Sequence, residues 1–147
     1  GRIEQRGAPH NIYAHPINTY VSNFIGSVNL LKGRVTSITE PGRGKVEVNS
    51  DGRTIQVPCK LAPGVESGAE AMISVRPENV QATRQNGDGN SLEGEVIQAI
   101  FLGNCVDCRV RWGEFEWKVL AHPRTGLKAG EKVYLRLDPE HTLAVQP

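Results

Sequence analysis

The segment Leu31-Lys32-Gly33-Arg34-Val35 decides the fold, because it occurs twice in the chain. It returns further along as Leu92-Glu93-Gly94-Glu95-Val96, with the leucine, the glycine and the valine unchanged. A second segment, Val75-Arg76-Pro77-Glu78, returns as Leu137-Asp138-Pro139-Glu140. The offsets of the two pairs differ by a single position, and self-similarity at a nearly fixed offset indicates a duplicated structural unit.

Each copy of the unit has the period-two alternation of β-strands. In the first copy, apolar residues alternate over positions 46–48 and 55–57, on either side of Asn49-Ser50-Asp51-Gly52. An Asp-Gly pair between two alternating runs predicts a β-hairpin, because glycine accepts a positive φ. In the second copy, positions 106–112 and 115–121 alternate around Gly113-Glu114. Each copy is therefore expected to contain a hairpin flanked by further short strands.

The size of the unit predicts how the copies are arranged. A unit of about 50–60 residues buries only about 60% of its unfolded surface and is marginally stable alone. We therefore expect an all-β protein made of tandem OB-like five-stranded, partly open barrels packed together. Residues 29–84 form the first predicted repeat, 85–91 a polar glycine-rich linker, and 92–147 the second repeat.

The segment 1–28 differs from the rest of the chain and predicts short N-terminal helices. Residues 10–13 follow a proline that suits a first helical turn. Residues 19–25 carry Val21, Phe24 and Ile25 on one side, the spacing of an amphipathic helix. This apolar stripe has nothing local to pack on, and the chain begins without a methionine. We therefore expect residues 1–28 to be the tail of a larger domain and the chain to be a fragment.

Composition narrows the class of protein. The 147 residues are 38% hydrophobic and carry a net charge of +1, from 17 basic and 16 acidic side chains. This balance argues against a protein that wraps nucleic acid, since such affinity comes from neutralising phosphates. No stretch approaches the length of about 18 apolar residues that a membrane span needs. Three cysteines are too few for a disulfide framework and fit a reducing compartment.

Three patterns suggest binding chemistry, and each has a simpler interpretation. Cys105-x-x-Cys108 resembles half of a zinc site, but no second cysteine pair exists, so buried strand thiols are expected and no metal. The run 86–90 begins like a calcium loop, but the glycine and the glutamate of that motif are missing. Trp112, Phe115 and Trp117 could stack on nucleic-acid bases, although their alternation also suits a core or a protein interface.

The sequence resembles a known family at its N-terminus and at two β-strand motifs. It is similar to the ATP-binding subunits of bacterial ABC importers, in the subgroup that serves spermidine/putrescine, ferric iron and maltose. The β part resembles the C-terminal transport-associated OB (TOBE) domain of that family. The segments that carry the resemblance are Gly1-Arg2-Ile3-Glu4-Gln5-x-Gly7-x-Pro9-x-x-Ile12-Tyr13-x-x-Pro16, Tyr20-Val21-x-x-Phe24-Ile25-Gly26-x-x-Asn29, Val75-Arg76-Pro77-Glu78 and Phe101-Leu102-Gly103.

The resemblance implies a regulatory and dimer-stabilising module on the cytoplasmic face of the bacterial inner membrane, with residues 1–28 as the tail of the nucleotide-binding domain. Its implied partners are a second copy of itself, the nucleotide-binding domain and the permease subunits, and no nucleic acid. The parent protein would use ATP and Mg to drive uptake. This chain has no G-x-x-x-x-G-K-[ST] loop and no LSGGQ-type signature, so we expect neither catalysis nor a cofactor in it.

The candidate functional residues are therefore interface residues. Arg76 and Glu78 flank a proline after a predicted strand, where a turn with a surface ion pair is the simpler interpretation. The aromatic residues are of the type that dominates protein interfaces. A small-ligand sensor for an oxyanion or a solute is the alternative function, with Arg76, Lys118 or Arg124 supplying charge. The predicted interface or interdomain residues are Arg76, Glu78, Phe101, Leu102, Trp112 and Trp117.

Overall fold

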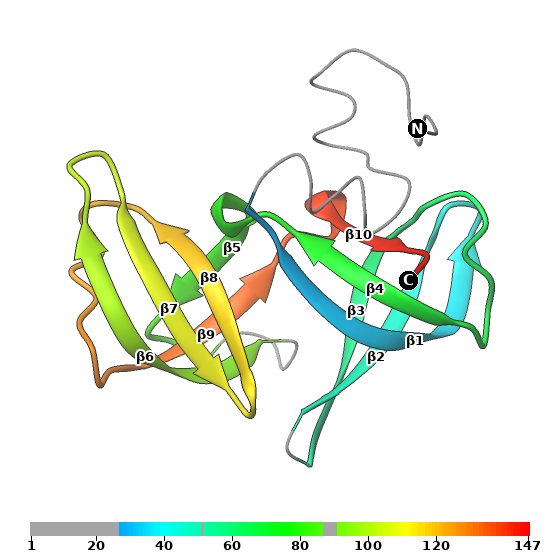
Figure 1. Cartoon of the computed structure of the whole chain (residues 1–147), viewed down its shortest axis with the longest axis horizontal. Coiled ribbons are helices and arrows are strands. Elements are labelled where there is room, and N and C mark those ends of the chain that lie inside the picture. The colour runs from blue at the N-terminus through cyan, green and yellow to red at the C-terminus, as the bar shows by residue number, and fades with distance from the viewer. Residues whose placement is uncertain (1–26, 51, 87–90) are drawn as a thin grey trace, which may run out of the picture.

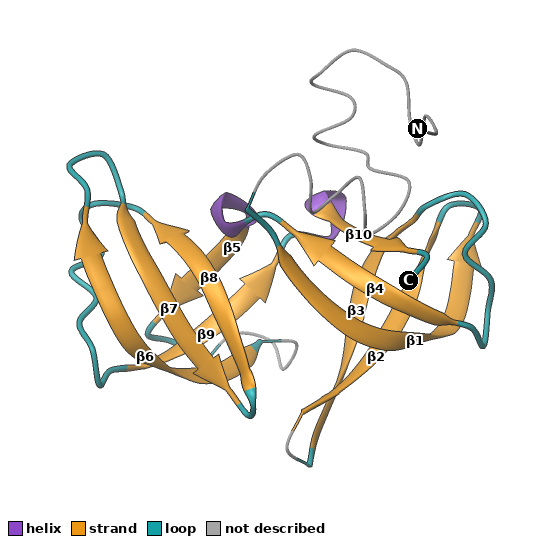
Figure 2. Ribbon diagram, in the orientation of Figure 1, coloured by secondary structure: helices purple, strands orange, loops and turns teal. Residues whose placement is uncertain are grey.

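The computed structural model describes residues 27–50, 52–86 and 91–147. These residues form β-strands joined by turns and two short 3-10 helices (Figure 2). The helices predicted at 10–13 and 19–25 lie outside the described residues. The elements are β1 (Asn29–Glu40), β2 (Arg43–Ser50), β3 (Arg53–Leu61), β4 (Glu70–Val75), η1 (Pro77–Asn79), β5 (Val80–Thr83), β6 (Leu92–Phe101), β7 (Val106–Trp112), β8 (Phe115–Ala121), β9 (Lys132–Leu137), η2 (Pro139–His141) and β10 (Thr142–Val145).

The strands form two five-stranded units that lie side by side (Figure 1). The first is a closed barrel with the strand order β1-β2-β3-β10-β4. The second, which we call the open sheet, has the order β5-β9-β6-β7-β8. The all-β prediction of paired OB-like units is confirmed. No helix among the described residues is long and apolar enough to span a membrane.

The two units exchange their last strands. β5 follows β4 in the sequence but pairs with β9 in the open sheet, where Val80 lies opposite Leu137. β10, at the end of the second repeat, instead pairs with β4 and β3 of the closed barrel. The sheets therefore do not follow the predicted division into 29–84 and 92–147. Each 3-10 turn carries the chain across from one unit to the other (Figure 1).

The repeated segments that open each unit occupy equivalent places. A register shift follows Val35 in the β1–β2 ladder, and another follows Val96 in the β6–β7 ladder. The Val35 N–H donates to the Ala69 carbonyl at 3.0 Å, and the Val96 N–H donates to the Glu131 carbonyl at 2.8 Å. The sequence duplication is therefore a structural duplication.

The glycine of each repeated segment allows a close approach between strands. A Cβ built on Gly33 would lie 2.6 Å from the Glu47 carbonyl oxygen, and one on Gly94 would lie 2.7 Å from the Arg111 carbonyl oxygen. Real Cβ atoms do not come this close to a backbone oxygen. Any side chain at these two positions would therefore push neighbouring strands apart, which explains why glycine recurs in both copies.

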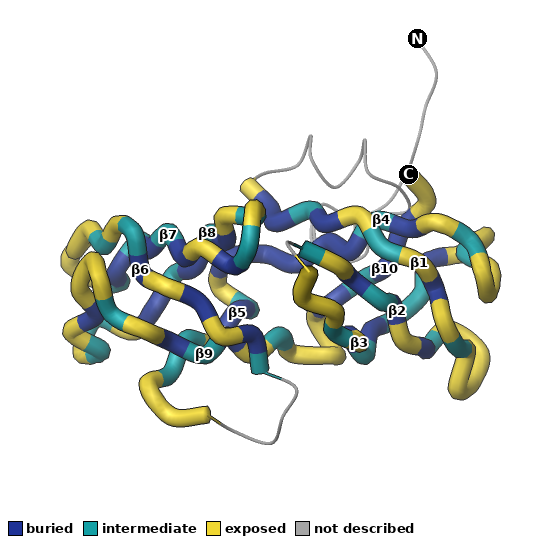
Figure 3. The backbone as a smooth tube through the Cα atoms, turned by 90° about the horizontal axis from the view of Figure 1, so that it is seen from below, coloured by how far each residue is buried: buried dark blue, intermediate teal, exposed yellow. Residues whose placement is uncertain are grey.

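One core runs through both units. Buried and exposed residues alternate along the strands, as Figure 3 shows for the backbone as a whole. The apolar residues of the barrel and of the open sheet form a single cluster of buried side chains, from Leu31 in β1 to Ala144 in β10. This contiguous core fits the expectation that neither repeat is stable alone.

Polar contacts fix the two units against each other. Asn29, buried at the start of β1, donates from Nδ2 to the Lys118 carbonyl at 2.9 Å and accepts from the Lys118 N–H at 2.7 Å. Its carboxamide thus pairs with the outer edge of β8 as a peptide group would. At the hairpin tip, Ser50 Oγ accepts from the Glu114 N–H at 3.0 Å, and Arg53 donates to the Glu93 carbonyl at 2.9 Å.

Alanine at either repeated glycine should destabilise the fold by a similar amount. Gly94→Ala and Gly33→Ala each force a methyl group against a neighbouring backbone carbonyl. Overpacking of this kind costs about 1–3 kcal/mol. Urea unfolding monitored by tryptophan fluorescence measures the loss. The exposed neighbour Glu95→Ala is the control, and a Gly94→Ala variant as stable as the wild type would contradict the close approach.

Candidate functional site

The structure places the predicted interface residues in three different environments. Arg76 is buried at the end of β4, with 6% of its surface exposed, and donates to the Ser27 carbonyl at 3.1 Å. Glu78 lies just beyond it, in η1, and is exposed. These two residues stand where the chain crosses from the closed barrel to the open sheet, so their position is interdomain within this chain.

The two tryptophans are core residues. Trp112 and Trp117 keep only 2% and 1% of their surfaces exposed, so they offer no surface to a partner. Phe115 packs edge-on against Trp117, with ring centroids 5.0 Å apart. The predicted alternation of buried and exposed residues along β7 and β8 is correct, and both tryptophans lie on the side that forms the core of the open sheet. The burial of the two tryptophans leaves neither ring exposed for stacking on a nucleic-acid base, whereas Phe115 is half-buried.

Phe101 and Leu102 lie on the surface. They are 66% and 56% exposed, and the neighbouring Ile100 is 45% exposed. The three residues, which we call the apolar tip, end β6 and begin the turn to β7, where the Leu102 N–H donates to the Cys105 carbonyl at 2.8 Å. Three consecutive exposed apolar side chains make this tip a candidate surface for contact with a partner. Among the described residues of the first repeat, only Ile38 is a large apolar side chain exposed in this way.

An ionic clasp, missed by the sequence analysis, fastens η2 to the closed barrel. The Glu140 carboxylate accepts two hydrogen bonds from Arg43, at 2.7 and 2.9 Å, and lies 3.4 Å from Lys60 Nζ. These two cations lower the pKa of Glu140 to about 2. Arg43 and Lys60 are neighbours in the β2–β3 ladder. The clasp therefore holds η2, which leads into β10, against β3, the strand with which β10 pairs.

The open sheet lacks the residues for a second clasp. The ladder positions equivalent to Arg43 and Lys60 are occupied by Asp107 and Leu120, which face each other in the β7–β8 ladder. The equivalence follows from the repeated glycines, because Gly33 contacts Val46 and Gly94 contacts Val110. Arg43 and Asp107 lie the same number of residues before these two valines. The glutamate equivalent to Glu140 is Glu78 in η1. A carboxylate and an apolar side chain thus replace two cations.

The barrel-closing strand pair also differs between the units. In the closed barrel, β10 runs parallel to β3, and the Ala62 N–H donates to the Ala144 carbonyl at 2.9 Å. The corresponding strands of the open sheet are β5 and β8. Among the described residues, no backbone ladder joins these two strands, and we call the gap between them the seam.

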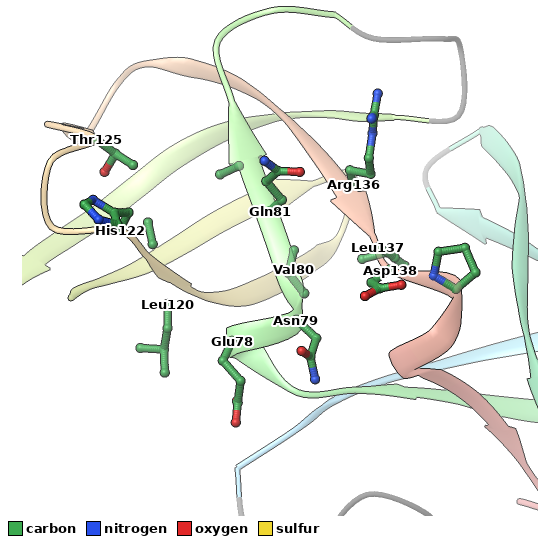
Figure 4. A pocket seen from close by; sticks show the side chains of 13 residues that line it. Glu78, Asn79, Val80, Gln81, Leu120, His122, Thr125, Arg136, Leu137 and Asp138 are labelled. Carbon is green, nitrogen blue, oxygen red and sulfur yellow. The ribbon is translucent and has the colours of Figure 1, made fainter. Parts of the chain in front are cut away.

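A cavity of about 520 Å³ opens at the seam (Figure 4). Its walls are the outer edge of β5, the end of β8, the β8–β9 loop and both 3-10 turns. The hydroxyl oxygen of Thr125, in that loop, is buried and has no hydrogen-bond partner within the described part of the chain. The charged and polar lining residues are Glu78, Asn79, Gln81, His122, Thr125, Arg136 and Asp138.

A second cleft, of about 430 Å³, lies between the hairpin tip of the closed barrel and the open sheet. Arg53, Arg111 and Lys132 contribute cations to it, and Glu93 and Glu95 contribute carboxylates. Glu93 forms an ion pair with Lys132 at 2.9 Å, which lowers the pKa of Glu93 and raises the pKa of Lys132. The predicted ligand cations Arg76, Lys118 and Arg124 line neither this cleft nor the seam cavity.

The two cysteines of the C-x-x-C motif lie in the β6–β7 turn and in β7. Cys105 is half-buried in the turn and Cys108 is buried in β7, where burial raises the pKa of its thiol. Burial raises the pKa of the Cys59 thiol to about 12. Within residues 27–50, 52–86 and 91–147, no group of three or more histidine, cysteine, aspartate or glutamate side chains is placed to hold a metal ion.

The fold and its two crossovers define the class of the chain. Residues 73–145 match the TOBE domain family, so this chain carries a TOBE domain. The matched stretch begins in β4 and includes both 3-10 turns, the open sheet and the exchanged strand β10.

The chain is, more particularly, homologous to ATP-binding subunits of ABC importers. It is 29% identical to the spermidine/putrescine import ATP-binding protein PotA of Frankia alni, over 97% of this chain and 33% of that protein. It is 30% identical to the PotA protein of Methylococcus capsulatus, over 95% of this chain and 40% of that protein. The chain thus spans about a third of the length of the curated relatives it matches.

A solved structure shares the fold. The molybdate-binding protein ModG superimposes with a TM-score of 0.64 at 16% sequence identity, over 81% of this chain and 96% of that one. At this identity the likeness shows the fold alone, which confirms the OB-like arrangement of the two units.

The clasp should make stability depend on pH in a specific way. The pKa of Glu140 lies below its ordinary value in the folded chain, so its ion pairs stabilise the fold above about pH 4.5 and are lost as the pH falls toward about 2. Glu140→Gln should therefore lower the urea midpoint at pH 6, with a smaller difference from the wild type at pH 3. Glu66→Gln, at an exposed turn, is the control. An equal loss at both pH values would contradict the clasp.

Proposed function

We propose that this chain is the regulatory and dimer-stabilising C-terminal part of the ATP-binding subunit of an ABC importer. The homology to PotA proteins over nearly the whole chain supports this proposal. ATP and Mg would bind in the part of the subunit outside this chain, and the permease subunits would be partners of that whole protein. The module would lie on the cytoplasmic side of the membrane, attached through those partners.

The exposed apolar tip is the observation that supports the dimer contact. The β6–β7 turn lies at the end of the open sheet that is far from the closed barrel (Figure 1), and the exposed Ile100, Phe101 and Leu102 lead into this turn. Burying three large side chains of this kind provides the nonpolar centre that a stable interface needs. A contact between the tips of two copies, related by a twofold axis, would bring together two ATP-binding subunits.

Arg76 and Glu78 support the regulatory part of the proposal. Arg76 is a buried cation at the crossover, bonded to the carbonyl of Ser27, the first described residue. A domain that precedes the TOBE domain would therefore connect directly to the element that joins the closed barrel and the open sheet. A movement of that domain would reach β1 through the chain itself and the crossover through the hydrogen bond from Arg76 to Ser27.

Removing the apolar tip should weaken self-association. The variant Phe101→Ser/Leu102→Ser exchanges two exposed apolar side chains for small polar ones, so the fold should be preserved while the dimer dissociates at least tenfold more readily. Sedimentation velocity at tens of micromolar measures the change. Ile38→Ser, which changes an exposed apolar side chain in β1 of the closed barrel, is the control. A wild-type chain that stays monomeric at every concentration, alone and within the full-length subunit, would overturn the dimer proposal.

A second candidate function, the sensing of a small oxyanion, is favoured by the charged cleft. Arg53, Arg111 and Lys132 converge there, and guanidinium groups bind oxyanions through paired hydrogen bonds. The cleft lies between the two units, so a bound anion would bridge them. The carboxylates of Glu93 and Glu95 oppose this role, which makes oxyanion sensing the weaker of the two candidates.

Thermal unfolding in the presence of oxyanions tests this candidate. Molybdate, sulfate or phosphate in millimolar excess should raise the unfolding midpoint, because a ligand of the native state stabilises it by mass action. Arg111→Ala should abolish the shift, and Lys45→Ala, at an exposed site on the closed barrel, should leave it unchanged. A midpoint that none of the three anions raises would exclude the oxyanion function.

A further inference from the structure

The β2–β3 hairpin of the closed barrel is longer than its counterpart in the open sheet. Four residue pairs of the β2–β3 ladder lie beyond Val46, whereas two pairs of the β7–β8 ladder lie beyond Val110, the equivalent valine. The additional pairs, at the end of the hairpin, form an extension that we call the arm: Asn49 with Thr54 and Ser50 with Arg53. Any site that the arm builds is therefore specific to one place in the chain and is not repeated in the second copy.

The arm is held against the open sheet at two points. Ser50 Oγ accepts from the Glu114 N–H at 3.0 Å, and a Cβ built on Gly113 would lie 3.0 Å from the Ser50 carbonyl oxygen. The second point is the Arg53 guanidinium, which donates to the Glu93 carbonyl at 2.9 Å. These contacts fix Arg53, a residue of the closed barrel, in the wall of the charged cleft of about 430 Å³.

The open sheet supplies a row of alternating charges to the same cleft. Lys132 in β9, Glu95 in β6 and Arg111 in β7 lie opposite one another on adjacent strands, and all three are exposed. Lys132 forms its ion pair with Glu93, at 2.9 Å, and not with Glu95. In the described part of the chain, neither Glu95 nor Arg111 has an ion-pair partner within 4.0 Å.

The charges that remain for a ligand are of both signs. Glu116, which faces Arg111 from β8, lies 3.8 Å from Arg109 instead. The cleft therefore offers two guanidinium groups, of Arg53 and Arg111, and the carboxylate of Glu95. An inorganic oxyanion at Arg111 would be repelled by Glu95, because directly opposite side chains in a ladder have Cβ atoms only about 4.5–5.5 Å apart. An ammonium group next to the anionic group of the ligand would replace this repulsion by a second ion pair.

We propose that the charged cleft binds a small zwitterion, with its anionic group on Arg111 and Arg53 and its ammonium group on Glu95. This proposal rests on the second candidate function, which assigns the cleft to an anion, and it specifies the class of ligand. Guanidinium groups bind oxyanions through paired hydrogen bonds, and the close spacing of Arg111 and Glu95 requires a ligand with only a few bonds between its charges. The volume is within the range of ligand pockets, about 300–1,000 Å³.

Titration with β-alanine tests the site. Added to the ¹⁵N-labelled full chain at constant ionic strength and pH 7, up to tens of millimolar, it should shift the amide signals of Arg53, Glu95 and Arg111 and leave the apolar tip unaffected. Small zwitterions also stabilise proteins by being excluded from their surfaces, so amide shifts are measured in place of an unfolding midpoint. Absence of these shifts would overturn the proposal.

Matched ligands show whether both charges matter. Propanoate keeps the carboxylate of β-alanine and lacks the ammonium group, so it should bind at least fivefold more weakly. Propylammonium keeps only the ammonium group, so it should leave the signals of Arg53 and Arg111 unshifted. Equal binding of β-alanine and propanoate would contradict a contact between the ligand and Glu95.

Two exposed residues of the cleft separate the zwitterion from a simple oxyanion. Glu95→Gln should weaken β-alanine binding to the level of propanoate, and Arg111→Ala should weaken the binding of both. Glu66→Gln, at an exposed turn of the closed barrel, is the control and should change neither. Phosphate shifts that Glu95→Gln strengthens, without shifts from β-alanine, would overturn the zwitterion site and retain the oxyanion candidate. Absence of shifts with β-alanine, propanoate and phosphate alike would overturn both.

Discussion

The exchange of β5 and β10 is the constraint on which the rest of the structure depends. Neither repeat completes a five-stranded sheet from its own residues, because the last strand of each lies in the other unit. Unfolding one unit would remove a strand from the other and expose the shared core. A unit of about 50–60 residues buries too little apolar surface to be stable alone, and the strand exchange adds the missing burial. The two crossovers, η1 and η2, consequently fix how the closed barrel and the open sheet are held together.

The two copies share their architecture but differ in how they close. Both begin with the same glycine-containing segment and a bulge, and in both a 3-10 turn follows the fourth strand. The closed barrel adds the clasp of Glu140 with Arg43 and Lys60, and its last strand pairs with β3. In the open sheet, Asp107 and Leu120 occupy the two cation positions, and the seam stays unpaired. One copy therefore completes its barrel, whereas the other keeps backbone groups available at an edge.

The sequence predicts the strands and the duplication well, because both are local patterns. Alternation locates the hairpins, and the recurrence of the glycine-containing segment shows that two units exist. The strand exchange cannot be read in the same way, since the spacing between the copies is identical whether β5 pairs with its own repeat or with the other. The sequence of a strand as short as Val80–Thr83 does not predict which strand it pairs with.

The candidate site was predicted only in part, for a related reason. Alternation correctly groups Trp112 with Val110 and Trp117 with Val119, but periodicity does not say which side of a sheet meets the core and which meets a partner. The exposed Phe101 and Leu102 lie where β6 ends and the turn begins. The alternation stops there, so it does not predict whether an apolar side chain is buried or exposed. The polar residues that join distant segments were missed because a residue with long-range partners has no local pattern. These pairs are Asn29 with Lys118, Arg53 with Glu93, and Glu140 with Arg43.

The seam, the apolar tip and the crossovers belong to one connected region. β8 forms one wall of the seam and pairs with β7, and the apolar tip lies at the β6–β7 turn of the same sheet. Both 3-10 turns line the seam cavity, so any group that enters it contacts the segments that hold the closed barrel and the open sheet together.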